Sequence, residues 1–225
     1  MVKDKDQLHD FIEGLLSTYR NSQRLAKIVS DILDVSRIEG KRLELNKELF
    51  NINEKVKNVI KDVHEKASEA NKTTNVKPID IRFETEQDPL TVLIDKTRMF
   101  QAISNLLNNA IKFSDNGSIT ITVKKDTSDS YYNNDNSYTI ATKNHINKNY
   151  VNSVIVSIKD RGKGIDNEIL SKLFNKFVTK SEKGTGLGLY IAKSIIEAHG
   201  GEIWAQNNKD GRGATFSFRL PLSND

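Results

Sequence analysis

The chain has 225 residues, of which 36% are hydrophobic and 28% charged, a balance typical of a soluble globular protein. Its net charge of +4 is mild and its Lys and Arg residues are dispersed, which allows an anionic ligand and does not indicate nucleic acid. Cysteine is absent, which excludes disulfides, thiolate metal sites and cysteine nucleophiles. The chain has no apolar run long enough for a membrane segment and no signal-peptide core, so we expect a cytoplasmic location, which leaves room for membrane attachment of a longer parent protein.

Residues 6–39 are predicted to form one long helix. Its apolar positions recur at helical spacing, and they include Phe11, Leu15, Leu25, Ile28, Val29, Ile32 and Val35. A stripe this wide needs other helices to cover it, which indicates a dimerising bundle helix; packing on the chain's own core is the alternative. Gly40 is expected to end the helix. Residues 41–52 are interpreted as a linker with a short strand at Leu43 and Leu45.

The central and C-terminal parts alternate helices with strands. Helices are predicted over residues 53–70, 96–113 and 187–199, with a short helix after Gly164. Asp95 is expected to cap the helix that begins at residue 96. Strands are predicted at residues 79–83, 91–94, 118–124, 151–159, 202–205 and 214–220. Between two of these strands, the Asn-, Ser- and Tyr-rich segment 126–150 is expected to be a flexible insert without a catalytic role.

The helix over residues 96–113 carries a polar face. Asn105, Asn109, Lys112 and Phe113 share it, because they lie at i, i+4, i+7 and i+8. An Asn oxygen suits a hard cation such as Mg²⁺ that bridges phosphates, and Lys112 would neutralise phosphate charge. The alternative is an ordinary solvated helix face. The four His residues are isolated, which argues against a zinc or haem site.

Two glycine clusters organise the C-terminal half. The first contains Asp160, Gly162, Gly164 and Ile165, and the second contains Gly184, Thr185, Gly186, Leu187, Gly188 and Leu189. Neither has the spacing of a P-loop or a G-x-G-x-x-G dinucleotide turn. A glycine turn that opens a helix aims free N–H groups at phosphate, and a buried Asp160 carboxylate would accept from the amine of adenine. We therefore expect an ATP site with a glycine-hinged lid, against the alternative of turns without a ligand.

The segment between the clusters is expected to be the lid. Phe174 and Phe177 bracket it, either to pack it over the ligand or as plain core aromatics. Lys180 is placed to meet the terminal phosphate when the lid closes.

These motifs together resemble the ATP-binding domain of sensor histidine kinases of two-component systems, which has the Bergerat fold of the gyrase and histidine-kinase group. The stretch from Gln101 to Ser114 is similar to the N box of that family, and the glycine clusters are similar to its first two glycine boxes. Phe174 to Phe177 resembles the F box, and Gly211-Arg-Gly213-Ala-Thr215 the last glycine box. Residues 28–39 are similar to the end of the second helix of the dimerisation hairpin.

The resemblance implies an α+β fold: a two-layer α/β sandwich, whose mixed sheet carries helices on one face, preceded by a long dimerisation helix. It divides the chain into a partial dimerisation helix (1–40), a linker (41–52) and a catalytic domain (53–225). It also implies that Asn109 coordinates Mg²⁺ and Asn105 helps to hold the phosphates. The remaining ATP-binding residues would be Lys112, Phe113, Asp160, Gly162, Gly164, Ile165, Phe177, Lys180, Gly184, Thr185, Gly186, Leu187, Gly188, Leu189 and Thr215.

One departure from the family concerns the phosphorylated histidine. The family usually carries it as His-Glu-Leu-Arg-x-Pro, and His9-Asp10-Phe11 imitates only the first residues of that sequence. No catalytic residue is identified, and we expect a fragment or a protein that phosphorylates in trans or only binds ATP. The implied partners are a receiver domain of a response regulator and a second copy of the chain. A gyrase-type ATP hydrolase is the alternative, but such relatives have a Glu where Asn105 stands, and Asn is no general base.

Overall fold

The computed structural model describes residues 2–71, 80–114, 118–126, 152–180 and 184–223. The chain divides into two compact units, Met1–Leu43 and Glu44–Asp225. The flexible insert predicted at residues 126–150 lies outside the described residues, apart from Asp126.

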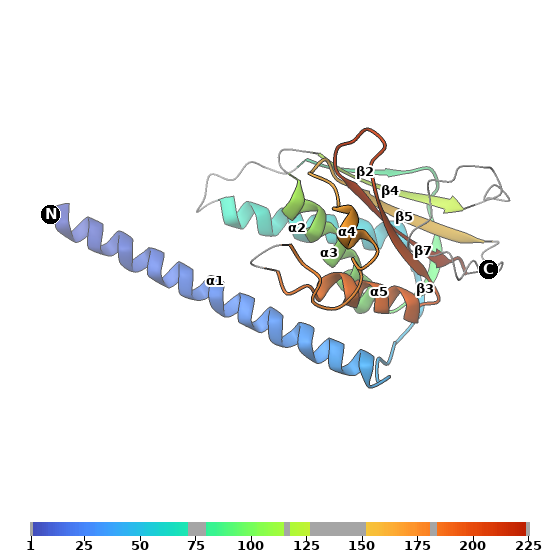
Figure 1. Ribbon diagram of the computed structural model, residues 1–225, viewed down its shortest axis with the longest axis horizontal. Coiled ribbons are helices and arrows are strands. Elements are labelled where there is room, and N and C mark those ends of the chain that lie inside the picture. The colour runs from blue at the N-terminus through green and yellow to red at the C-terminus, as the bar shows by residue number, and fades with distance from the viewer. Residues whose placement is uncertain (1, 72–79, 115–117, 127–151, 181–183, 224–225) are drawn as a thin grey trace. The chain divides into compact units, whose positions relative to one another are not determined.

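The first unit consists mainly of the helix α1 (Val2–Glu39), which is uninterrupted (Figure 1). Its large apolar side chains are exposed at Phe11, Ile12, Leu15, Tyr19, Leu25, Val29, Ile32 and Leu33. The helix ends at Glu39, where the Gly40 N–H donates to the Ser36 carbonyl over 3.0 Å. Lys41 rather than Gly40 takes the positive φ, at 52°. Within the described residues, no helix combines the length and the apolar character needed to cross a membrane.

The second unit begins with the strand β1 (Glu48–Asn51), and the strand predicted at Leu43 and Leu45 is wrong. β1 pairs antiparallel with β3 (Thr91–Ile94), whereas residues 42–47 have no regular structure. Two residues before β1 bind to helix ends instead. The Asn46 N–H donates to the Asp95 carboxylate over 3.0 Å, and the Lys47 ammonium donates to the Ala198 carbonyl over 2.9 Å.

Five strands form the main sheet in the order β2-β4-β5-β7-β6. β2 and β4 are parallel and the other neighbours are antiparallel, so the sheet is mixed. The strands are β2 (Ile81–Thr85), β4 (Ile119–Asp126), β5 (Ser153–Lys159), β6 (Glu202–Asn207) and β7 (Ala214–Pro221). Alternate residues of the central strands are buried, which is the pattern of a sheet covered on one face.

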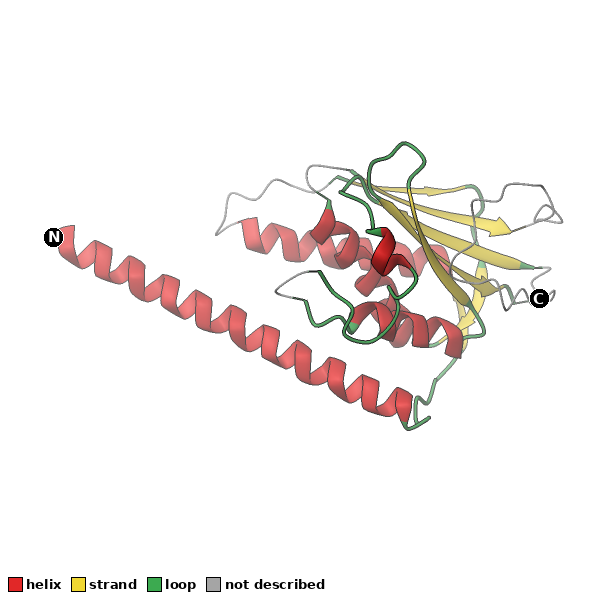
Figure 2. Ribbon diagram, in the orientation of Figure 1, coloured by secondary structure: helices red, strands yellow, loops and turns green. Residues whose placement is uncertain are grey.

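Three helices pack on this sheet and form the second layer (Figure 2). They are α2 (Ile52–Asn71), α3 (Lys96–Phe113) and α5 (Gly188–Ala198), and the short α4 (Asn167–Leu170) follows the first glycine cluster. The core side of α3 is fully buried at Met99, Ala102, Ile103, Leu106, Leu107 and Ala110. Each buried Leu or Ile side chain contributes roughly 1.5–3 kcal/mol of transfer free energy, and this burial fixes which face of α3 remains for a ligand.

Candidate functional site

The helix α3 contacts both glycine clusters. Near its middle, the side-chain amide of Asn105 donates to the carbonyl of Gly188 over 3.1 Å, at the start of α5. At its C-terminal end, the Phe113 carbonyl oxygen lies so close to Gly162 that a Cβ there would meet it at 1.9 Å. Only glycine permits this approach. The structure thus brings the polar face of α3 and both clusters together, although they lie far apart in the sequence.

Asp160 is a buried carboxylate directly after β5. Its Oδ1 atom accepts from the Gly162 N–H over 2.8 Å and from the Ala214 N–H over 3.2 Å. Its Oδ2 atom has no hydrogen-bond donor among the residues that the structure describes. Burial raises the pKa of the Asp160 carboxyl above its usual value, and the two N–H donors oppose this shift. One oxygen is therefore held in place while the other remains available to a donor.

The N-terminus of α5 differs from that of the other helices at the site. Asp95 caps α3 by accepting from the Thr97 and Arg98 N–H groups over 3.0 and 2.9 Å. By contrast, Leu187 at the start of α5 makes no side-chain cap. The first N–H groups of an α-helix have no partner within the helix, so this end offers donors and the positive end of the dipole to an anion. Gly188 and Leu189 lie in this first turn.

The predicted lid contains one residue in an uncommon conformation. Phe177 has a φ of 64° and the residue is 70% exposed, whereas Phe174 is buried. The Phe177 N–H donates to the Gly186 carbonyl over 3.0 Å. A Cβ at Gly186 would lie 2.5 Å from the Phe177 carbonyl carbon, so this contact also requires glycine. Of the two aromatic residues, Phe174 packs in the core and Phe177 is the one on the surface.

Lys180, which was expected near the terminal phosphate, pairs with the carboxylate of Asp166. Asp166 also caps α4, since its other oxygen accepts from the Glu168 N–H over 2.9 Å. The lysine therefore has a protein anion as its partner in this structure. Residues 181–183 lie outside the described residues.

The remaining predicted residues lie on the same elements. Asn109 is half-buried on α3, and the exposed Lys112 ammonium lies 5.5 Å from the centre of the Phe113 ring. Gly184 and Thr185 are half-buried, and the Thr185 hydroxyl accepts from the Leu187 N–H over 3.3 Å.

Two further residues, which the sequence interpretation missed, hold the first cluster. The side-chain amide of Asn207 bonds to both backbone polar groups of Ile165, and Asn208 binds the Asp160 carbonyl. Thr215 donates its hydroxyl proton to Asn208 over 2.6 Å. The available sequence signal was a pair of consecutive Asn residues at the end of β6, shortly before the glycine turn at residues 211–213.

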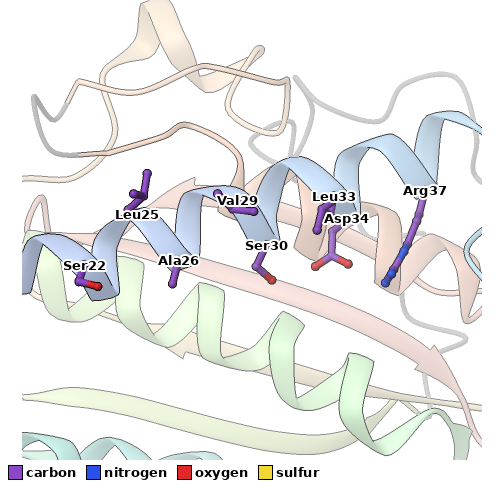
Figure 3. A pocket seen from close by; sticks show the side chains of 8 residues that line it. All are labelled: Ser22, Leu25, Ala26, Val29, Ser30, Leu33, Asp34 and Arg37. Atoms are coloured by element: carbon purple, nitrogen blue, oxygen red, sulfur yellow. The ribbon is translucent and has the colours of Figure 1, made fainter.

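A separate hollow runs along α1 (Figure 3). Eight α1 side chains line it at helical spacing: Ser22, Leu25, Ala26, Val29, Ser30, Leu33, Asp34 and Arg37. None of the residues predicted to bind ATP is among them. The hollow is therefore a property of the apolar stripe rather than of the candidate site.

Residues 94–224 match the family described as "Histidine kinase-, DNA gyrase B-, and HSP90-like ATPase", over more than half of the chain. The chain belongs to this family. The boxes that suggested it lie in the matched segment, so the resemblance to the ATP-binding domain of sensor histidine kinases is confirmed.

The chain is also similar to two curated sensor proteins, one of which is a sensor histidine kinase. The chain is 28% identical over 220 residues to the sensor histidine kinase WalK of Bacillus subtilis, a match that covers 94% of the chain and 31% of WalK. It is 30% identical over 224 residues to the sensor protein KdpD of Clostridium acetobutylicum, which covers 97% of the chain and 21% of KdpD. The chain thus spans less than a third of the length of these relatives.

A solved structure shares the fold. The catalytic domain of histidine kinase ThkA superposes with a TM-score of 0.57 at 34% identity, covering 78% of this chain and 95% of that domain. The predicted fold class, a mixed sheet with helices on one face after a long N-terminal helix, is confirmed.

Proposed function

We propose that this chain binds Mg-ATP and transfers the γ-phosphoryl group to a histidine of a two-component phosphorelay. Membership of the ATPase family and the similarity to sensor histidine kinases support this activity. The observation that carries it is the double contact of α3, with Asn105 bonded to Gly188 at one glycine cluster and Phe113 against Gly162 at the other. A ligand between these elements meets amides, a carboxylate and an uncapped helix end at once.

The base is proposed to bind at Asp160. Its free Oδ2 atom accepts from the exocyclic amine of adenine, while Oδ1 stays bonded to Gly162 and Ala214. Gly164, Ile165 and Thr215 flank this position. Phe113 and Phe177 supply apolar contact to the nucleotide.

The phosphates are proposed to lie at the second glycine cluster. The N-terminus of α5 faces them with unpaired N–H groups, and the backbone of residues 184–189 wraps them. Lys112 and Lys180 supply positive charge. Lys180 then exchanges its partner Asp166 for a phosphate oxygen.

Magnesium is proposed to bind through Asn109. Among the described residues, no cluster of three or more His, Cys, Asp or Glu side chains has the arrangement of a metal site. An amide oxygen fits a cation that keeps several waters and takes its other ligands from phosphates. Bound there, Mg²⁺ supplies charge neutralisation for the phosphate oxygens, and Asn105 holds the adjacent backbone at Gly188.

The chemical step needs position and charge more than covalent work by the protein. A histidine nitrogen attacks the γ-phosphorus in line, the bond to the bridging oxygen breaks, and ADP leaves. His199 is not that nucleophile. It is buried, its Nε2 accepts from the Asp95 N–H over 2.9 Å, and its Nδ1 lies 2.7 Å from the Ile195 carbonyl oxygen.

An ATP hydrolase of the gyrase type and a non-catalytic ATP-binding module are the alternatives. Hydrolysis needs a general base that activates water. Asn105 cannot act as that base, because its amide nitrogen donates to the Gly188 carbonyl and an amide oxygen is barely basic. This residue favours phosphotransfer over hydrolysis.

Two partners follow from the proposal. The exposed apolar stripe of α1 supports a homodimer through this helix. The kinase ThkA, 30% identical at a TM-score of 0.59, has been solved in complex with the response regulator protein TrrA. We propose that a receiver domain likewise takes the phosphoryl group from the histidine in this system.

Incubation with γ-labelled ATP and Mg²⁺ tests the function. Label on a histidine of the chain, or of an added histidine-containing kinase fragment, supports phosphotransfer. Release of labelled phosphate without label on any histidine instead supports the hydrolase. ATP that is bound but stays intact supports the non-catalytic module. The Asp160→Asn variant is the control, since at an ATP concentration near the wild-type dissociation constant it should lower each of these signals if they come from this site.

A further inference from the structure

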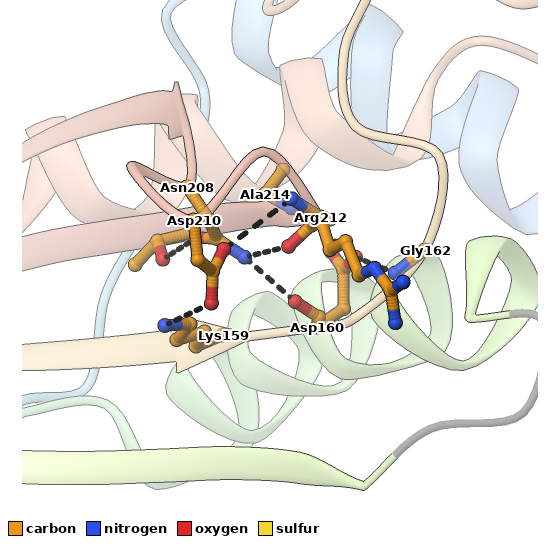
Figure 4. A network of polar contacts seen from close by, with 8 residues as sticks. Lys159, Asp160, Gly162, Asn208, Asp210, Arg212 and Ala214 are labelled. Carbon is orange, nitrogen blue, oxygen red and sulfur yellow. Dashed lines mark hydrogen bonds and ion pairs between the residues drawn. The ribbon is translucent and has the colours of Figure 1, made fainter.

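Asn208 lies at the centre of a polar network at the end of β6 (Figure 4). Its amide nitrogen donates to the carbonyl of Asp160 over 2.8 Å and to the carbonyl of Arg212 over 2.6 Å. Its amide oxygen accepts from the hydroxyl of Thr215 over 2.6 Å. An Asn side chain has two N–H donors and one oxygen, so both donors and the oxygen are engaged. The residue is buried, and a buried amide satisfied in this way fixes the position of every group that it binds.

This network holds Asp160 from two sides. Asn208 binds the Asp160 backbone directly, and it also binds Arg212 in the turn before β7 and Thr215 at the start of β7. That turn delivers the Ala214 N–H to the Asp160 carboxylate over 3.2 Å, and the Asp160 N–H returns a bond to the Ala214 carbonyl over 2.9 Å. The orientation of the carboxylate therefore depends on Asn208.

Asn207 fixes the other end of the first glycine cluster. Its amide nitrogen donates to the Ile165 carbonyl over 2.8 Å, and its oxygen accepts from the Ile165 N–H over 2.6 Å. The side chain thus imitates the paired bonds of a neighbouring strand. Since Gly162 and Gly164 lie between Asp160 and Ile165, the two asparagines clamp the loop at both of its ends.

We propose that Asn207 and Asn208 are positioning residues that make the site selective for a 6-amino purine over a 6-oxo purine. The inference rests on the proposed binding of ATP at Asp160. A carboxylate with a fixed Oδ2 accepts from the amine of adenine and repels the carbonyl oxygen that replaces this amine in inosine triphosphate. Without the two asparagines, the Asp160 carboxylate can rotate away from the base or water can enter beside it. The amine of adenine then loses its acceptor, and the carbonyl oxygen of inosine triphosphate is no longer repelled. Selectivity falls while the phosphate contacts remain.

A purely structural role makes a different prediction. If Asn208 only stabilises the turn, its loss weakens ATP and inosine triphosphate binding by the same factor, and the ratio of the two affinities stays constant. The ratio is thus the informative quantity. Asn53 is a matched control, because it is buried and its amide also donates twice, to the Gln87 carbonyl over 2.8 Å and to the Asp88 carboxylate over 3.1 Å, on a different part of the unit.

The experiment measures the affinities of the whole chain for Mg-ATP and Mg-inosine triphosphate by calorimetry. The wild type should prefer ATP by a factor on the order of 100, Asn208→Ala should narrow this factor about tenfold, and Asn207→Ala should narrow it less. Asn53→Ala should lower the unfolding temperature and leave the ratio unchanged.

Three results would overturn the inference. The inference is wrong if a folded Asn208→Ala variant keeps the wild-type ratio of ATP to inosine triphosphate affinity. It is also wrong if Asn53→Ala lowers that ratio as much as Asn208→Ala does. If Asn208→Ala does not fold, Asn207→Ala decides, since an unchanged ratio there rejects the clamp. A wild type that binds neither nucleotide rejects the proposed function itself, which distinguishes that failure from failure of the clamp alone.

Discussion

At one end of the candidate site, Asp160 is held by backbone donors and by the side chain of Asn208, and the side chain of Asn207 holds Ile165 in the same glycine cluster. At the other end, α5 begins without any side-chain cap. At the first end, protein groups already bind the Oδ1 atom of Asp160 and both asparagine side chains, and the Oδ2 atom of Asp160 remains available to a ligand. The second exposes N–H groups and includes Phe177 at a φ of 64° and a lysine paired with Asp166 on the surface.

This difference indicates that one end of the site sets base selectivity and the other adapts to the phosphates. A binding group that is already fixed loses little entropy when the ligand arrives, which favours selectivity at the base. A segment with exposed donors and few buried contacts adjusts to its ligand at low cost, as a lid must. Substitutions at the base end should therefore cause large losses of ATP affinity and of base selectivity, whereas substitutions at the phosphate end should cause smaller losses of affinity.

The largest effect is expected from Gly162→Ala. The new methyl group would lie 1.9 Å from the Phe113 carbonyl oxygen, so the loop or the end of α3 must move. We expect a loss of stability of about 3 kcal/mol, at the upper end of overpacking costs, and no measurable ATP binding. Thermal unfolding and calorimetry measure both. Gly14→Ala is the control, because a Cβ at Gly14 meets nothing within 4 Å; a variant at position 162 that behaves like this control would show that the close approach is unimportant.

Asp160→Asn should separate binding from stability. Asn keeps an oxygen for the Gly162 and Ala214 N–H groups but turns an N–H group toward the adenine amine. We expect ATP affinity to fall roughly 10- to 100-fold. Because burial raises the pKa of Asp160 in the folded state, the ionised carboxylate disfavours folding at neutral pH, and the unfolding temperature of the nucleotide-free variant should rise. A parallel loss of stability and affinity would instead make Asp160 a structural residue.

Asn109→Asp tests the phosphate end. The substitution adds a negative charge beside the phosphates and removes the amide donors, so Mg-ATP affinity should fall about tenfold. Asn108→Asp places the same charge one residue earlier on α3 at an exposed position, and it should bind Mg-ATP normally. Equal affinities for the two variants would remove Asn109 from the metal site.

The smallest effect is expected at His199, which links the C-terminal end of α5 to the residue that caps α3. It follows α5 and accepts from the N–H of Asp95, the cap of α3. Burial lowers the pKa of His199 below its usual 6.5, and the Lys47 ammonium lowers it further, whereas Asp95 and the Ile195 carbonyl oppose this. Above pH 6.5 the imidazole is neutral in both states; as the pH falls below 6.5, the unfolded chain takes up the proton first, so stability decreases.

Uptake of this one proton changes the free energy of unfolding by at most about 1.4 kcal/mol per pH unit. His199→Gln should flatten the pH dependence of the unfolding free energy in this range, as followed by denaturant titration. His64→Gln, at an exposed position of α2, should leave the curve of the wild type intact. Identical slopes for wild type and His199→Gln would contradict the assignment.

Local chemistry was predictable from the sequence, and distant pairing was not. The helix over residues 96–113 was expected with its correct bounds, because Asp95 and the apolar spacing are local signals. The strand expected at Leu43 and Leu45 was misplaced, since strand position depends on the partner β3, some 40 residues away. The pairing of Lys180 with Asp166 and the bonds from Asn207 and Asn208 to the first cluster likewise arise only once the chain has folded.

The apolar side chains along α1 make protein concentration a variable in every measurement on this chain. Leu15, Leu25 and Val29 are each exposed to solvent by half or more in a single copy. Self-association that covers them would stabilise the folded state by mass action, so the unfolding temperature should increase on concentrating the sample. Nucleotide affinities and phosphorylation rates should accordingly be compared at matched dilution.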